Sequence, residues 1–326
     1  MSLSSPRARG LRAVLMLSLF LGGSLAAPSS RAQQQSAKRA AAATPESVIF
    51  AVTGRADAEF AFEPIATYRR GIFAGSITGE SSQAELTSFA KKYYRAGQRY
   101  RLIWGGAEAG ALVAKQSQQE SDCAKASATA DVQTEVQLGG NRMALATDSP
   151  KLGLAKSSRR APTDAERAQV KAHVERIFRE KGVPARALSK LQTINLTATD
   201  LNNDGTAELI GTYSVRRDGT AILIDQLFVL AEPATTSAAG SDMKIGVARY
   251  RQIKGADFSD PESLESVGQN AFQTEILLDQ LDVNGDGTGE VFTISYSFEG
   301  TNYTIYQKGA KGWARVKEFY NYRCAF

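Results

Sequence analysis

Two short loops carry the residue types that bind a hard divalent cation. Each has the form D-x-N-x-D-G-x-x-E, and the two begin 82 residues apart, at Asp200 and Asp282. Positions 1, 3 and 5 supply side-chain oxygens, position 7 a backbone carbonyl and position 9 a carboxylate. Such a cation prefers six to eight oxygens of these kinds. The candidate ligands are Asp200, Asn202, Asp204, Thr206 and Glu208 in the first loop, and Asp282, Asn284, Asp286, Thr288 and Glu290 in the second.

Both loops place glycine at position 6, where the chain must turn sharply with positive φ. These glycines are Gly205 and Gly287. Three carboxylates in one loop repel each other unless a cation binds, and no soft ligand stands nearby, which argues against zinc or copper. We therefore expect up to two structural Ca²⁺ ions, with dissociation constants of roughly 10⁻⁴–10⁻³ M as in other extracellular modules. The alternative is a pair of Asx-rich turns that hold no metal.

The residues around the loops distinguish them from helix-flanked calcium sites. Gly211 and Thr293 stand at position 12, where a helix–loop–helix site has glutamate, and alternating apolar residues predict strands on both sides. Over about 25 residues each, the two units resemble the strand–loop–strand calcium repeats of the FG-GAP/VCBS type found in integrin-like propellers. That family usually has aspartate at position 9, and its Phe-Gly/Gly-Ala-Pro signature is missing here. Because a propeller takes about four to eight blades, we expect a single curved sheet or a compact sandwich.

The whole chain is expected to be mainly β with a few helices, in two β-rich domains. Short apolar runs separated by glycine turns predict strands in residues 46–149. Residues 150–161 are predicted to be a linker, and residues 162–326 a helix followed by the two-repeat β-domain. Two capping boxes, Ser82 with Glu85 and Thr163 with Glu166, predict where helices begin. The apolar stripe of the second helix is expected to lie against the C-terminal sheet.

The N-terminus has the pattern of a secretory signal peptide, because arginines precede a short apolar run and small residues follow it. We place the cleavage after Ala32, with Ala26 or an uncleaved anchor as alternatives, and expect residues 33–45 to be a flexible N-terminus. Residues 1–32 hold four arginines and no acid, so the mature chain keeps 35 basic and 34 acidic residues. That balance gives no reason to expect nucleic acid as a partner. We expect export to the periplasm, cell surface or medium, without stable membrane insertion after cleavage.

Outside the loops, few residues point to a particular chemistry. The two cysteines, Cys123 and Cys324, permit one disulfide or two buried thiols. The only histidine, His173, falls on the flank of a helical stripe, and no nucleophile motif accompanies it. The first hypothesis is a non-catalytic exported protein with a calcium-stabilised β-domain that binds an unknown protein or glycan. The alternative is a secreted or periplasmic hydrolase that uses carboxylates of the first domain, among them Glu63, Glu80, Glu85 and Glu108.

Overall fold

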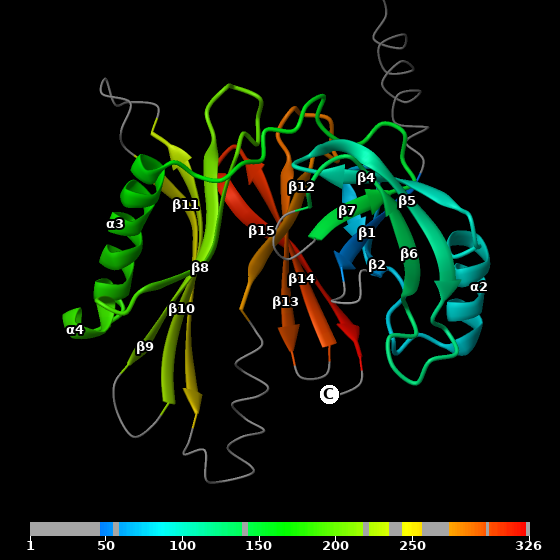
Figure 1. The fold of residues 1–326 in the computed structure, drawn as a ribbon, viewed down its shortest axis with the longest axis horizontal. Helices are drawn as coiled ribbons and strands as arrows, with labels where there is room; N and C mark the ends of the chain where they lie inside the picture. The colour runs from blue at the N-terminus through cyan, green and yellow to red at the C-terminus, as the bar shows by residue number, and fades with distance from the viewer. Residues whose placement is uncertain are drawn as a thin grey trace, which may run out of the picture. The chain divides into compact units, whose positions relative to one another are not determined.

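The computed structural model describes residues 46–54, 59–138, 143–217, 222–234, 243–255, 274–297 and 300–323. The predicted signal peptide at 1–32, the flexible N-terminus at 33–45 and a helical turn expected at Asp260–Pro261 lie outside these residues. Within them the chain is mainly antiparallel β-sheet with three helices, as expected from the sequence (Figure 1). Contacts between residues group Pro45–Phe326 as one compact unit. The predicted division into two domains at 150–161 stays a prediction.

The first seven strands form a sheet that closes on itself. The neighbour order is β1-β7-β4-β5-β6-β2, and β2 also pairs with β1, so six strands make a ring; β3 adds to the end of β2. We call the ring together with β3 the closed sheet. Its strands are β1 (Ser47–Gly54), β2 (Phe60–Arg69), β3 (Ile72–Ala74), β4 (Arg99–Trp104), β5 (Ala107–Ser117), β6 (Ala128–Gln133) and β7 (Met143–Thr147).

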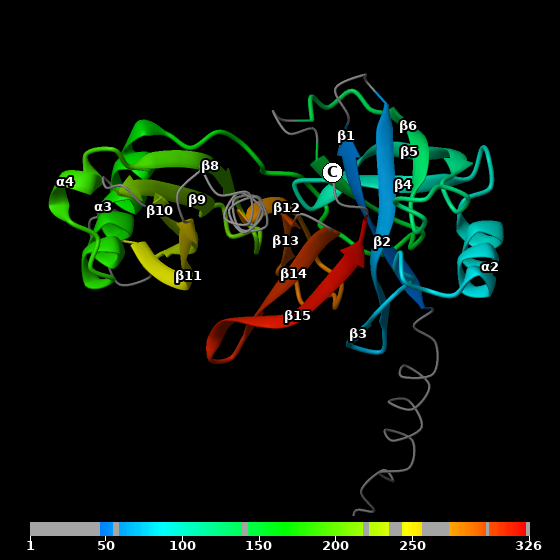
Figure 2. The same cartoon turned by 90° about the horizontal axis from the view of Figure 1, so that it is seen from below.

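Alternating residues of the closed sheet serve two different cores. Val48, Phe50 and Val52 of β1 join a cluster inside the ring, while Ile49 and Ala51 join a cluster outside it. Period-2 alternation sends successive side chains of a strand to opposite faces. Helix α2 (Gln83–Tyr93) contributes residues to the inner cluster and lies at the side of the ring in Figure 2. The predicted capping box of Ser82 with Glu85 begins this helix.

The rest of the chain forms two four-stranded antiparallel sheets with the same connectivity, in which each strand pairs with the next along the chain. The first repeat sheet consists of β8 (Gln192–Thr199), β9 (Glu208–Arg217), β10 (Ile222–Pro233) and β11 (Met243–Gly255). The second repeat sheet consists of β12 (Ile276–Leu281), β13 (Glu290–Ser297), β14 (Gly300–Gly309) and β15 (Gly312–Tyr322).

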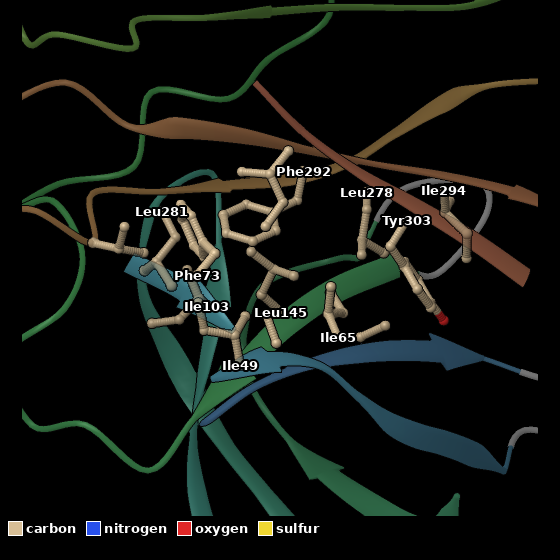
Figure 3. Packing of buried hydrophobic residues seen from close by; sticks show 14 of the residues in the cluster. Ile49, Ile65, Phe73, Ile103, Leu145, Leu278, Leu281, Phe292, Ile294 and Tyr303 are labelled. Carbon is tan, nitrogen blue, oxygen red and sulfur yellow. The ribbon is translucent and has the colours of Figure 1, made fainter. Parts of the chain in front are cut away.

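Three apolar clusters pack against the two repeat sheets. Helix α3 (Asp164–Glu180), begun by the predicted capping box of Thr163 with Glu166, buries Val170, Val174 and Phe178 against the first repeat sheet. The short helix α4 (Ala185–Leu188) packs into the same cluster. A second cluster lies between the two repeat sheets, and a third joins the second repeat sheet to the closed sheet (Figure 3). Two sheets of this kind therefore bury their apolar faces without the further blades of a propeller.

The segment 150–161, predicted to be a linker, packs against both candidate loops. The amide of Gly153 donates to the carbonyl of Asp282 at 2.9 Å. The hydroxyl of Ser158 accepts from the amide of Asp200 at 2.7 Å, and Arg160 exchanges two backbone hydrogen bonds with Ala198. The segment thus fixes the base of each loop.

Cys123 is disulfide-bonded. The sequence has one other cysteine, Cys324, which lies outside the described residues. Of the two alternatives left open by the sequence, the disulfide is therefore the one supported. Among the described helices, none combines the length and apolar character needed to cross a membrane.

Candidate metal centre

The two predicted loops occupy equivalent places in the two repeat sheets. One joins β8 to β9 and the other joins β12 to β13, and both lie at the upper end of the sheets in Figure 1. They also touch each other, because the amide of Gly289 in the second loop donates to the carbonyl of Leu201 in the first at 2.7 Å. Loops that the sequence places 82 residues apart are thereby brought side by side.

Several hydrogen bonds inside the two loops recur at the same positions. The position-1 carboxylate accepts from the amide of the position-6 glycine, at 2.8 Å from Asp200 to Gly205 and 3.0 Å from Asp282 to Gly287. The position-5 carboxylate accepts from the position-7 amide at 2.8 Å in both loops. The position-3 amide donates to position 5 at 3.0 and 2.9 Å, in the Asn202–Asp204 and Asn284–Asp286 pairs.

The backbone of the two loops matches as well. Gly205 and Gly287 have the same φ of 86°, and position 4 is left-handed in both loops, with φ of 56° at Asn203 and 77° at Gly285. Asparagine is one of the few residues other than glycine that adopts this region readily. The two sequences therefore encode one turn geometry twice, as the shared pattern predicts.

The position-9 glutamates are buried and face the backbone of their own loops. Glu208 accepts from the amide of Leu201 at 2.8 Å, and Glu290 accepts from the amide of Val283 at 2.9 Å. Glu290 also accepts from Asn284 at 2.8 Å and from Gln307 at 2.9 Å. Burial raises the pKa of each glutamate to about 7, against the lowering effect of these hydrogen bonds. The longer arm of glutamate, relative to aspartate, is what lets each carboxylate reach position 2 of its loop.

The junction of the loops is strongly acidic. It combines Asp200, Asp204 and Glu208 with Asp282, Asp286 and Glu290. The charges of the second loop also act on the closed sheet. Burial raises the pKa of Tyr68 on β2, and the charges of Glu290, Asp282 and Asp286 raise it further. A divalent cation bound in either loop would offset the repulsion among that loop's own carboxylates.

The donor set fits a hard cation in its chemistry. Carboxylate, amide and backbone oxygens are available at positions 1, 3, 5 and 7, and neither loop sequence contains Cys, Met or His. In the part of the chain that the structure describes, no group of three or more His, Cys, Asp or Glu side chains has the arrangement of a metal site. To offer a cation enough oxygens, each loop must use its asparagine side chain and backbone carbonyls in addition to its carboxylates. The hydrogen bonds above also satisfy the loops as metal-free Asx turns.

The four carboxylates considered for hydrolysis have separate surroundings. Glu63 is buried and contacts Tyr303, Asn321 and Arg323, whereas Glu85 accepts from the N-cap of α2. Glu108 pairs with Arg101 at the surface at 2.7 Å, and Glu80 is exposed in a turn. His173 lies half-buried on α3, 3.1 Å from the guanidinium of Arg176. The contacts of these residues are those of caps, surface pairs and one buried cluster.

Two residues that hold the loops together were not singled out from the sequence. Ser158 accepts from the amide of Asp200, and Gly289 donates to Leu201. Gly289 occupies position 8 of the second loop, where the first loop has Ala207. This difference at position 8, one of several between the loops, is the signal that could have pointed to the contact. No family model matches the chain, and no curated protein or solved structure was found to be similar to it.

Proposed function

We propose that the chain is an exported, non-catalytic binding protein whose two repeat sheets are fastened together by calcium. The observation that carries this proposal is the contact, Gly289 to Leu201, between two loops that share the ligand pattern and most of their turn geometry. Their resemblance to FG-GAP/VCBS-type calcium loops supports the choice of cation. A signal-like N-terminus and the disulfide of Cys123 support export, because disulfides persist in oxidising compartments.

The residues that would hold the ions are the oxygens of positions 1, 3, 5 and 7, with the position-9 glutamates closing each loop. A bound cation would supply positive charge that cancels carboxylate repulsion. Four residues position the loops. Gly205 and Gly287 make the turns, and Ser158 and Gly153 bond to the loop bases.

Calcium titration of the mature protein tests the proposal. After treatment with EGTA and dialysis, added CaCl₂ should raise the melting temperature, because a ligand at about 100 times its dissociation constant stabilises by about 2.7 kcal/mol per site. Asp204→Ala combined with Asp286→Ala should abolish the rise, since it removes the position-5 ligand of each loop. Asp131→Ala, at an exposed acid of β6, is the matched control and should respond like the unaltered protein. A melting temperature that EGTA and CaCl₂ leave unchanged would overturn the proposal.

A further inference from the structure

The facing surfaces of the two repeat sheets change character along their strands. Near the loops they are apolar, with Ile210 and Leu230 of the first repeat sheet packed against Val291 and Tyr306 of the second. Farther along the same strands the inward positions are polar. They are Thr212, Gln226, Thr293, Ser295, Asn302 and Thr304. A polar side chain between two sheets carries a desolvation cost unless it is hydrogen-bonded. Here Thr212 and Thr293 donate to Glu275, and Gln226 donates to Thr274.

These polar positions line a cavity of about 520 Å³ that opens between the sheets. That volume lies within the range of small-molecule sites, about 300–1,000 Å³. Phe228, which lines the cavity, stacks on Tyr306 with ring centroids 5.5 Å apart, and both rings belong to the neighbouring apolar cluster. Charged and aromatic residues complete the lining: Arg249, Arg251, Glu275, Arg315, Glu318 and Tyr320.

The floor of the cleft is held in place by one hydrogen-bonded network. Glu275 accepts from Arg249 at 3.1 Å, from the hydroxyl of Tyr306 at 2.8 Å and from Thr293 at 2.6 Å. Arg249 also donates to the hydroxyl of Tyr306 at 3.1 Å. The network joins both repeat sheets, so the polar groups on the floor are preorganised before any ligand arrives, which reduces the entropic cost of binding.

The rim of the cleft carries hydrogen-bond donors and acceptors beside an aromatic ring. Arg315 and Glu318 pair at 2.6 Å, and Arg249 approaches Glu318 at 3.4 Å. The side chains of Arg315 and Glu318 are about half exposed, and Tyr320 is 38% exposed. Guanidinium and carboxylate groups present paired donors and paired acceptors in fixed planes. The lining therefore suits a ligand rich in hydroxyl groups. Because Arg249 and Arg315 are paired with Glu275 and Glu318, little positive charge is left unopposed for a polyphosphate.

We propose that this cleft, between β10–β11 and β13–β15, binds an oligosaccharide. Arg249, Glu275, Gln226 and Asn302 would bond the hydroxyl groups, and the ring of Tyr320 would pack against the apolar face of a sugar ring. The inference deepens the proposed function by naming the ligand class. It does not depend on calcium, because the cleft lies at the opposite end of the sheets' facing surfaces from the loops.

Binding to a printed array of defined oligosaccharides tests the cleft, followed by calorimetry with the best-retained glycan. The unaltered mature protein should retain at least one glycan, and Arg315→Ala and Tyr320→Ala should each weaken its binding about tenfold or more. Both residues are at the surface, so the variants should keep the melting temperature of the parent. Ile194→Ala, at a 47% exposed position of β8 outside the cleft, should bind normally.

Two results would overturn the inference: retention of no printed glycan above the level of serum albumin, or equal binding by the two rim variants and the parent. Repeating the assay with Asp204→Ala combined with Asp286→Ala separates the two proposals. Glycan binding by that variant alongside a melting temperature insensitive to calcium in the parent would retain the cleft and reject the calcium-fastened fold. A calcium-dependent melting temperature with no glycan retained would do the reverse.

Discussion

The amide of Gly289 donates to the carbonyl of Leu201 at 2.7 Å, and this bond joins two loops that are far apart in the sequence. Each loop is also tied to the segment 150–161, through Ser158 in one case and Gly153 in the other. The loops, the two repeat sheets and this segment are therefore expected to unfold together. A change that alters the turn in either loop should be felt as a loss of stability of the packed sheets.

The turn glycines give the most direct test of that view. Gly205→Ala and Gly287→Ala should each lower the free energy of unfolding by about 1–2 kcal/mol, the cost of holding an L-residue left-handed. No atom lies within 4 Å of an added Cβ at either position, so the loss would come from backbone strain alone. Gly309→Ala is the control, because its surroundings are equally open and its φ is not positive. Urea unfolding in EGTA measures the difference, and equal stability of all three variants would contradict it.

The parts of the fold that the sequence predicted correctly are those set by local chemistry. The capping boxes at Ser82 and Thr163 begin helices because each hydroxyl and its glutamate satisfy amides within one turn. Strand β2 runs through Pro64, which cannot donate a hydrogen bond to a neighbouring strand. In the structure the β1–β2 register shifts between Ile49 and Phe50, opposite Pro64 and Ala66, and this bulge accommodates a residue that cannot donate.

The features that the sequence did not predict depend on contacts between distant residues. Closure of the first sheet needs β1 to pair with β7, nearly a hundred residues away, and nothing within either strand encodes that partner. The same holds for the site. The ligand pattern around Asp200 and Asp282 is local, so it could be recognised, whereas the side-by-side placement of the loops comes from packing of the repeat sheets.

A buried carboxylate on β12 should give the protein a measurable pH dependence. Asp279 accepts from the amides of Gly105 and Gln280 at 2.9 and 2.8 Å, and lies 3.5 Å from Arg159. Burial raises its pKa to about 6, against the lowering effect of these partners. The folded state thus holds the proton more tightly than the unfolded chain. The resulting stability is fully present below about pH 4 and is lost as the pH rises through about 6.

Asp279→Asn should remove that part of the pH profile. The difference in unfolding free energy between parent and variant should change by on the order of 3 kcal/mol between pH 4 and pH 7. Taking the difference cancels the titration of groups shared by both proteins. Urea unfolding at half-unit pH steps, with calcium removed, makes the measurement. A parent-minus-variant difference that stays constant across this range would show that Asp279 does not titrate there.

Glu63 is expected to hold the C-terminal strand against the closed sheet. It is buried, accepts from Tyr303 and Asn321, and pairs with Arg323 at 2.8 Å. Glu63→Gln should cost about 3–5 kcal/mol, because it leaves Arg323 without its counter-charge in a buried setting. Glu108→Gln is a matched control on the same sheet, since its pair with Arg101 is exposed and worth at most about 1 kcal/mol. Equal losses for the two variants in urea unfolding would refute the assignment.

The disulfide of Cys123 should contribute to stability by restricting the unfolded chain. With one other cysteine in the sequence, Cys324, the bond would close nearly two-thirds of the chain into a loop. Dithiothreitol, or Cys123→Ser, should lower the free energy of unfolding by about 2–4 kcal/mol. Dithiothreitol should then have no further effect on the variant. A thiol assay on the purified protein, unfolded in guanidinium chloride, should find no free thiol before reduction and two after it. Two free thiols before reduction would show that the bond does not form. The proposal of an oxidising compartment would then lose its main chemical support.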